Sequence, residues 1–337
     1  MAGRLVSRTA GVMPRLLGRR MQSNWSPVVP KGKLPVYDEA LAFIEADSKV
    51  QRELRDIAKE QQGSSKELIY AHEVASELNL PEVRNQFLAG EADLSKPVFR
   101  HLREQAWRLG GSLDQLIERA TLMHVLPDVV PEITFEADLQ VKFGSGDGVG
   151  DHGGQGGDIL AGVHLPTSLT RQAPQITATV FHTETRNYTL MLVDPDKPSL
   201  ENDSFETYIH WLVQDIPISA TQSQLPMTTK EVLPYIPPHP QQGTPYHRYT
   251  MLLFEQSDTS LLNTAARTMI NVAQFATTHN LQLRGLHFWR EQWSKENQSS
   301  VSEVYRDVLK EDEPRYGYEP RQDKLKDAFG VRHSKYY

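Results

Sequence analysis

The stretch Leu192-Val193-Asp194-Pro195-Asp196-Lys197-Pro198 decides how the rest of the chain is interpreted. Apolar residues of the kind found in β-strands lead into an aspartate, and prolines stand at positions 195 and 198. Proline fixes φ and removes a hydrogen-bond donor. We therefore predict that a strand ends here and that a stiff loop holds the Asp194 carboxylate.

Two more stretches place polar side chains on strands. In the run 208–213, strand alternation puts Tyr208 and His210 on one face and apolar residues on the other. In the run 243–255, His247 and Tyr249 share a face for the same reason. Each pattern alone has an ordinary explanation, because a histidine on a strand is usually a satisfied core or edge group.

The surrounding sequence is punctuated like an all-β domain. Short apolar and β-branched runs are separated by Pro, Asp and Asn turns, with few crossover helices between them. This pattern predicts a mainly β domain over 126–293, an antiparallel β-sandwich. The expected strands are 134–143, 175–180, 188–193, 208–216, 249–254 and 285–289, with a helix over 261–279.

A glycine-rich segment, 144–157, interrupts the predicted sandwich. It lacks the spacing of a dinucleotide-binding loop, and no helix follows to bind phosphate, so we interpret it as an insertion. His152 with Asp147 and Asp151 could meet a metal ion, but a loop without fixed geometry is a poor site. We therefore predict no metal and no other cofactor.

The chain before the sandwich divides into two parts. Residues 1–21 are rich in arginine and free of acidic residues, as in a mitochondrial presequence cleaved near Arg20, and the first acidic residue of the chain is Asp38. Residues 22–125 form an N-terminal extension and helical arm of about four helices. Capping-box patterns start at Ser64 and Ser112, and breaks are expected at Pro81 and Gly110.

One apolar stripe stands out in the arm. Its members, separated by seven, four and three positions, are Phe43, Val50, Leu54 and Ile57. Such an arm suits wrapping around a partner or packing on its own sandwich. At the other end, 294–337 is a charged C-terminal extension with a short helix near 301–309.

Composition excludes several classes of function. The 337 residues include no cysteine, which removes disulfides and thiolate chemistry. The net charge of −7 argues against binding nucleic acid through bulk charge, and no apolar run is long enough to span a membrane. There is no Gly-x-Ser-x-Gly, no His-Glu-x-x-His and no P-loop, so we predict that the chain is not an enzyme.

Taken together and in this order, the three motifs and the stretch 271–281 resemble the phosphatidylethanolamine-binding-protein family. The run 208–217 is especially similar to the plant floral-regulator branch. The resemblance implies a small anion pocket whose walls would be Asp194, Pro195, Pro198, His210, His247 and Tyr249. Imidazole and hydroxyl groups can donate to phosphate oxygens, and a carboxylate can orient a histidine.

The sequence departs from the family pattern at the lip of this pocket. His239 stands where the family has a glycine that lets backbone amides approach an anion, and Pro245 replaces another. A side chain at position 239 is expected to fill or narrow the pocket. We therefore interpret the pocket as vestigial.

The whole chain resembles the mitochondrial ribosomal branch of the family, in a form suggestive of fungi. That resemblance implies a structural component of the large subunit near the central protuberance, in the mitochondrial matrix, contacting ribosomal RNA and neighbouring proteins and not forming homo-oligomers. The expected basic contacts are Arg315, Arg321, Lys324, Lys326, Arg332 and Lys335. The alternative is a free mitochondrial binder of a small anion or lipid headgroup, or an inhibitor of a protease or kinase.

Overall fold

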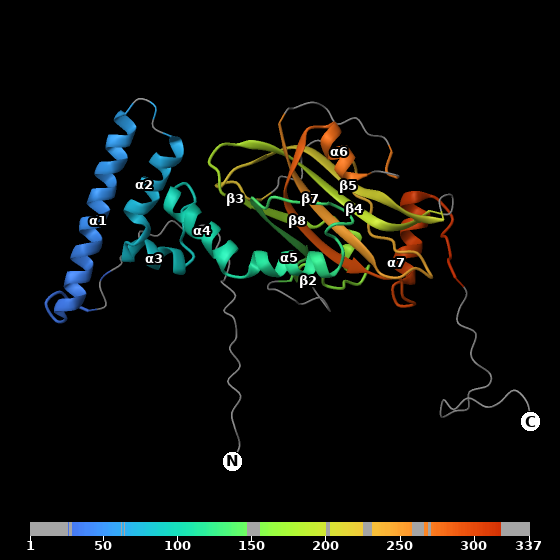
Figure 1. The fold of residues 1–337 in the computed structure, drawn as a ribbon. Helices are drawn as coiled ribbons and strands as arrows, with labels where there is room; N and C mark the ends of the chain where they lie inside the picture. Colours follow the sequence, from blue (N-terminus) through green and yellow to red (C-terminus); the bar gives the residue numbers. More distant parts are fainter. Residues whose placement is uncertain are drawn as a thin grey trace, which may run out of the picture. The chain divides into compact units, whose positions relative to one another are not determined.

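The computed structural model describes residues 26, 29–61, 63, 65–146, 156–199, 203–224, 231–257, 266–268 and 271–317 (Figure 1). The chain divides into two compact units. One contains the arm up to Asp114 with two short segments, Phe181–Glu184 and Ser219–Thr221, and the other contains the remaining residues. The predicted presequence and most of the glycine-rich insertion lie outside the described residues.

The first unit holds the helical arm. Its helices are α1 (Pro35–Glu60), α2 (Lys66–Leu78), α3 (Pro81–Leu88), α4 (Pro97–Leu109) and the start of α5 (Ser112–Leu122). Pro81 begins α3 instead of only breaking the chain, because proline has no N–H to satisfy at the first helical position.

Local contacts explain where the helices begin and how they pack. The cap of α2 is Ser65, whose hydroxyl accepts from the backbone N–H groups of Glu67 and Leu68 at 3.1 and 3.3 Å, so the predicted cap at Ser64 was wrong by one residue. The buried Arg100 guanidinium donates to the carbonyls of Leu94 and Ser95. These bonds tie the segment before α4 to the arm's apolar cluster of Val83, Val98, Phe99 and Leu102.

The second unit contains two antiparallel sheets. The smaller sheet has the order β2-β1-β3, and the larger has the order β6-β5-β4-β7-β8. Their strands are β1 (Ala137–Gly144), β2 (Gly156–Asp158), β3 (Gln175–Val180), β4 (Arg186–Ser199), β5 (Ser204–Ile218), β6 (Glu231–Leu233), β7 (His247–Gln256) and β8 (Leu281–Glu291). The predicted mainly β, antiparallel fold with an N-terminal helical region is therefore confirmed.

A large apolar core joins most strands of this unit. In β1, the alternate apolar residues Ala137, Leu139, Val141 and Phe143 are buried, as expected for a strand with one face in the core. They belong to one cluster with residues of β3, β4, β5, β7 and β8, including Trp211. The polar side chains of the site lie at one end of this core.

The helix expected over 261–279 is much shorter in the structure. Helix α6 spans Val272–Thr278, and residues 266–268 are not helical. Asn271 caps it, because its side-chain oxygen accepts from Gln274 N at 3.0 Å. An Asn at this position competes with the backbone for hydrogen bonds and so starts a helix instead of continuing one.

The C-terminal extension begins with a helix, as expected. Helix α7 (Gln298–Glu303) continues into a π-helical turn, η2 (Val304–Leu309), which ends at Lys310 in the left-handed conformation. Val301, Val304 and Tyr305 are buried. A short 3₁₀ turn, η1 (Leu169–Arg171), precedes β3. Among the described helices, none combines the length and apolarity needed to cross a membrane.

Candidate functional site

Asp194 lies within a strand and not in the loop that the sequence predicted. Strand β4 continues to Ser199, but its pairing with β5 shifts register between Leu192 and Val193 and again between Asp194 and Lys197. Such bulges bend a strand and re-aim its side chains. The two prolines are therefore accommodated as irregularities in the ladder, and the Asp194 carboxylate turns inward, where it is buried.

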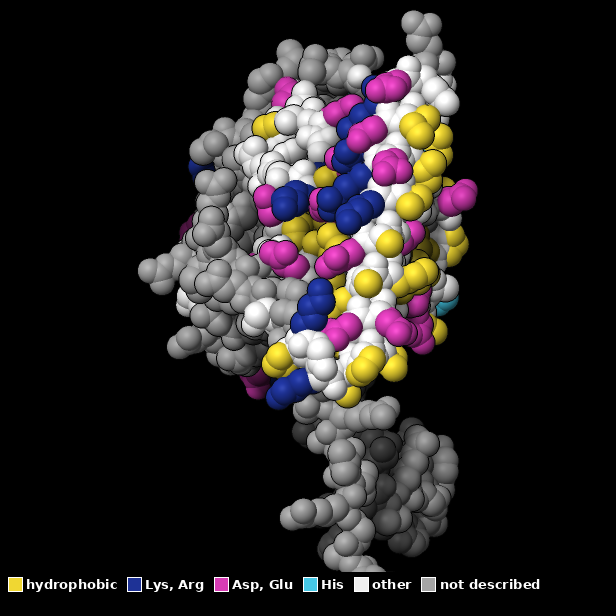
Figure 2. All heavy atoms as spheres, turned by 90° about the vertical axis from the view of Figure 1, so that its left-hand side faces the viewer, with side chains coloured by type: hydrophobic (Ala, Val, Ile, Leu, Met, Phe, Trp, Pro, Cys, Tyr) yellow, Lys and Arg dark blue, Asp and Glu magenta, His cyan; other side chains and the backbone are white. Residues whose placement is uncertain are grey.

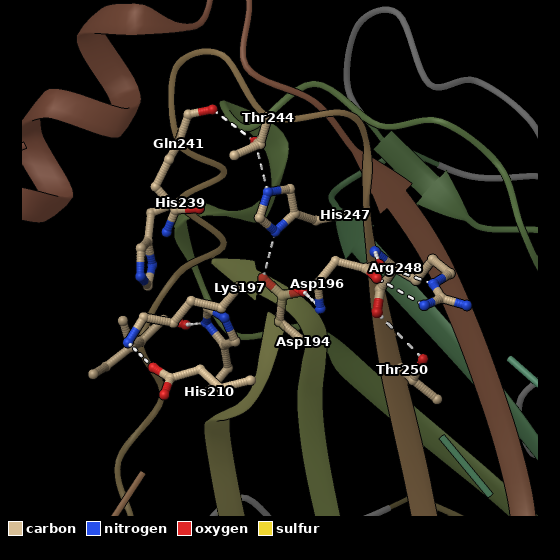
Figure 3. Close-up of polar contacts among 12 residues, drawn as sticks. Asp194, Asp196, Lys197, His210, His239, Gln241, Thr244, His247, Arg248 and Thr250 are labelled. Atoms are coloured by element: carbon tan, nitrogen blue, oxygen red, sulfur yellow. Dashed lines mark hydrogen bonds and ion pairs between the residues drawn. The ribbon is translucent and has the colours of Figure 1, made fainter. Parts of the chain in front are cut away.

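Asp194 and His247 form the centre of the site (Figure 3). Asp194 Oδ2 lies 2.7 Å from His247 Nδ1, and Asp194 Oδ1 accepts from the Asp196 N–H at 2.9 Å. Burial disfavours both charges, but the mutual attraction and hydrogen bond outweigh it, so the pKa of His247 is raised and that of Asp194 is lowered. The pair is therefore an ion pair.

A hydroxyl completes a chain of hydrogen bonds beside this pair. His247 Nε2 lies 2.8 Å from Thr244 Oγ1, and Thr244 Oγ1 donates to the Gln241 carbonyl at 2.8 Å. The order Asp-His-Thr resembles a catalytic triad in connectivity. An imidazolium donates at both nitrogens, however, and the hydroxyl proton is directed at Gln241, so this arrangement positions a loop instead of activating a nucleophile.

The other two histidines of the site are neutral. His210 Nδ1 donates to the Ile236 carbonyl at 2.8 Å, and His239 Nδ1 donates to the Pro237 carbonyl at 2.8 Å. Burial lowers the pKa of His210 to about 3 and that of His239 to about 4. His210 Nε2 is buried and has no hydrogen-bond partner among the described residues.

His239 fills the space beside His210, as expected from its replacement of a glycine. Its ring centroid lies 5.0 Å from that of His210, 5.6 Å from Tyr208 and 5.3 Å from Tyr305. The Tyr305 hydroxyl accepts from Gln241 Nε2 at 3.0 Å. The sequence did not predict Tyr305 as part of the site, because no motif around Tyr305 links it to His239 or Gln241, which lie far earlier in the chain.

The cluster is closed to solvent. Asp194, His210, His239 and His247 expose 3, 1, 4 and 0% of their surface. Tyr249 is also buried, and its ring centroid lies 5.2 Å from that of His210. The structure thus brings together Asp194, His210, His247 and Tyr249 of the predicted wall, while Pro195 and Pro198 are half-buried in β4.

A second buried acid was not predicted. Glu291, the last residue of β8, accepts from Trp289 Nε1 at 2.8 Å and from Thr170 Oγ1 at 3.1 Å. Burial raises its pKa to about 8. Glu291 pairs with His247 in the β7–β8 ladder, so one end of this sheet holds the Asp194–His247 ion pair between β4 and β7 and a neutral carboxyl on β8.

An arginine fixes the bulged strand from outside. Arg248 donates through Nε and Nη2 to the two oxygens of Asp196 at 2.8 and 2.7 Å. Its Nη1 donates to Asp128 Oδ2 at 3.0 Å and to the His124 carbonyl at 2.6 Å. Arg248 is the neighbour of His247 on β7, and Asp196 lies close to Asp194 on β4. The Arg248–Asp196 contact therefore holds together the two strands that carry the ion pair.

The predicted partner-contact residues are mostly beyond the described part of the chain. Arg315 is exposed, and the other five, from Arg321 to Lys335, lie outside the described residues. The same holds for Asp147, Asp151 and His152 of the insertion. Within the described ranges, no group of three His, Asp or Glu side chains is arranged to hold a metal ion.

Comparison with known proteins agrees with the motifs. The family described as "Phosphatidylethanolamine-binding protein" matches residues 151–289. Large ribosomal subunit protein mL38 of Schizosaccharomyces pombe is 28% identical over 273 residues, which is 78% of this chain and 86% of that protein. Protein FLOWERING LOCUS T of Arabidopsis thaliana is 32% identical over 128 residues, 37% of this chain and 69% of that protein.

Solved structures with this fold also resemble the chain. A carboxypeptidase Y inhibitor in complex with its cognate proteinase is 23% identical, with a TM-score of 0.44 over 53% of this chain and 95% of that one. A phosphatidylethanolamine-binding protein from Plasmodium vivax is 21% identical, with a TM-score of 0.40 over 53% of this chain and 97% of that one. From the match over residues 151–289 and the likeness to FLOWERING LOCUS T, the chain belongs to the phosphatidylethanolamine-binding-protein family.

Proposed function

We propose that this chain is a structural component of the mitochondrial large ribosomal subunit. The observation that carries the proposal is the extent of the likeness to mL38. It covers 78% of this chain and 86% of that protein, whereas the family itself matches only residues 151–289. The likeness therefore continues well beyond the shared domain, as expected if both chains keep their extensions for the same assembly.

The finer part of the proposal rests on the sequence motifs and on the charge pattern. The chain acts in the mitochondrial matrix, delivered by residues 1–21, and lies near the central protuberance of the subunit. Its net charge is −7, so contacts to neighbouring proteins outnumber contacts to RNA phosphates. The phosphate contacts come from local basic groups, namely Arg315, Arg321, Lys324, Lys326, Arg332 and Lys335.

The buried cluster around Asp194 and His247 supports a structural role and not a catalytic one. A catalytic base must reach a substrate proton, and here His210, His239 and His247 are enclosed. The hydroxyl beside His247 donates to a backbone carbonyl. We interpret the cluster as the interior of a scaffold.

Sedimentation tests this proposal. A tagged full-length chain in mitochondrial lysate is expected to migrate with the large subunit in a sucrose gradient at moderate salt, and to stay with it when the small subunit is dissociated. Recovery of the chain at the top of the gradient, with the subunits intact, contradicts the proposal.

The alternative is a free binder of a small anion or lipid headgroup, or an inhibitor of a protease or kinase. What favours it is that Asp194, His210, His247 and Tyr249 still converge in one cluster. What opposes it is that the His239 ring packs against His210 and Tyr305 in turn packs against His239. Saturable binding of phosphate or phosphoethanolamine to the full chain, lost in His210→Ala, would favour the binder.

A further inference from the structure

The outer face of helix α1 carries an exposed apolar stripe. Val36, Phe43, Val50 and Ile57 expose 79, 76, 50 and 51% of their surface, and Leu54 beside them is exposed as well. In Figure 2, yellow side chains follow the helix that faces the viewer along its length. Another face of the helix is packed, because Ser48 and Ala58 are buried and Ser48 Oγ donates to the Ser76 carbonyl of α2 at 2.6 Å.

The spacing of the stripe indicates the shape of its occupant. Val36, Phe43, Val50 and Ile57 stand seven residues apart throughout. On a straight helix such a row drifts by about 20° per heptad, and it stays on one side only when two helices wind around each other. The 26 residues of α1 make a rod of about 39 Å, so the row offers a partner helix several consecutive turns.

The charges beside the stripe indicate the chemistry of the occupant. Glu39, Glu53 and Glu60 each follow a stripe residue by three positions, and Asp47 follows Phe43 by four, so all four carboxylates border the stripe. The basic residues of the helix lie elsewhere. None of its four basic residues, Lys49, Arg52, Arg55 and Lys59, stands three or four positions from a stripe residue.

We propose that the outer face of α1 forms a coiled coil with an amphipathic helix of another protein, and that this helix carries Lys and Arg beside its apolar seam. An acidic border repels RNA phosphates, and it also repels a second copy of α1, which would bring like charges together. This inference stands on α1 alone and does not depend on the ribosomal proposal.

A pair of synthetic helices tests the proposal with the full-length chain. Both are 28-residue peptides with Ile and Leu at the seam positions of each heptad. One carries Lys at the flanking positions, and the other carries Glu there. By fluorescence anisotropy, the Lys peptide is expected to bind about tenfold more tightly than the Glu peptide at 0.15 M salt.

Three variants separate the seam from its border. Phe43→Ser with Val50→Ser removes two exposed apolar side chains of the stripe. The variant is expected to keep the circular dichroism spectrum of the parent and to lose binding of the Lys peptide. Glu53→Lys with Glu60→Lys keeps these apolar side chains and reverses the preference toward the Glu peptide. The control is Glu45→Lys, an exposed residue two positions after Phe43 and so across the helix, which leaves both affinities unchanged.

Photo-cross-linking in intact mitochondria identifies the occupant, with p-benzoylphenylalanine at position 43 of the full chain. The expected product is a peptide of another protein with seven-residue apolar spacing and flanking Lys or Arg. Cross-links to RNA or to a second copy of the chain overturn the proposal. So does failure of the Lys peptide to bind, or equal binding of the two peptides. None of these outcomes depends on where the chain sediments.

Discussion

At the residue scale, His239 decides whether the inherited pocket is open. Its ring packs against His210, Tyr208 and Tyr305, and a buried ring of this size contributes about 2–4 kcal/mol through packing. His239→Ala is expected to destabilise the chain and at the same time to create space in front of His210 Nε2. We predict that phosphate binding, undetectable in the parent by NMR titration, appears in the variant.

His287→Ala is the matched control for this gain of binding. His287 is also a buried histidine, with Nε2 near the Ile159 carbonyl at 3.2 Å and a pKa lowered by burial to about 4. Its removal leaves a cavity of similar size without the other histidines around it. Phosphate binding by both variants, or by neither, would contradict the assignment of His239 as the residue that fills the pocket.

Because of Glu291, the free energy of unfolding is expected to fall as the pH rises into the alkaline range. Its folded pKa is raised to about 8, so the folded chain keeps a proton that the unfolded chain releases near pH 4.3. The stabilisation is fully present below the unfolded pKa and is lost as pH rises through 8. We expect Glu291→Gln, which cannot ionise, to reduce the fall in the urea midpoint between pH 5.5 and 8.5.

The urea midpoint of the Glu291→Gln variant should still fall to some extent between pH 5.5 and 8.5. The pKa of His247 is also raised, so its contribution is present below the unfolded value and is lost as pH rises through its folded value. Glu311→Gln changes an exposed carboxyl and should follow the parent curve. A Glu291→Gln curve that also coincides with the parent would show that this carboxyl is ionised in the folded chain.

At the scale of elements, Arg248 joins three segments that are distant in sequence. Its side chain binds Asp196 on β4 through two hydrogen bonds and reaches Asp128 and the His124 carbonyl after α5. Arg248→Ala leaves Asp196 only the backbone N–H of position 248, which donates to it at 2.9 Å, and should cost roughly 3 kcal/mol of the unfolding free energy. Arg248→Lys should recover only part of it, because an ammonium cannot reproduce the forked geometry.

The exposed pair Arg306–Asp307 provides the control for this measurement. Arg306 also donates twice to a carboxylate, at 2.7 and 2.9 Å, but at the surface. Exposed pairs contribute little, so Arg306→Ala should leave the urea midpoint unchanged. If the two alanine variants lose the same stability, Arg248 is not the joint between these segments.

The elements also show what the sequence could and could not predict. Strand periodicity located β1, because alternate residues of it are buried, and a β-branched run located β3. The bulges in β4 escaped prediction, since a proline-rich motif looks like a turn whether or not the ladder continues beyond it. Asp194, His210, His247 and Tyr249 could be grouped from family motifs, but Tyr305 and Glu291 could not, because only tertiary packing brings them there.

At the scale of the whole molecule, the charged tail is expected to bind through electrostatics. Replacing Arg315, Arg321, Lys324, Lys326, Arg332 and Lys335 with Gln removes six charges. If they neutralise phosphates, association with the large subunit should become weaker and less dependent on salt. Gradients at several salt concentrations measure both effects.

Two other basic residues of the C-terminal extension serve as the control. Arg306→Gln with Lys310→Gln changes exposed positions outside the set of six and should leave sedimentation unchanged. Association of the six-residue variant that equals the parent at every salt concentration would exclude the tail as an RNA contact.

Tyr305 has a consequence for any molecule that would use the old pocket. It belongs to the extension, yet its ring lies against His239 and its hydroxyl against Gln241. The extension thus holds a tethered side chain against the residue that fills the pocket, at an effective concentration in the millimolar range. Dilution cannot remove this contact, so detaching the extension is expected to loosen the packing of the His239 ring that fills the pocket.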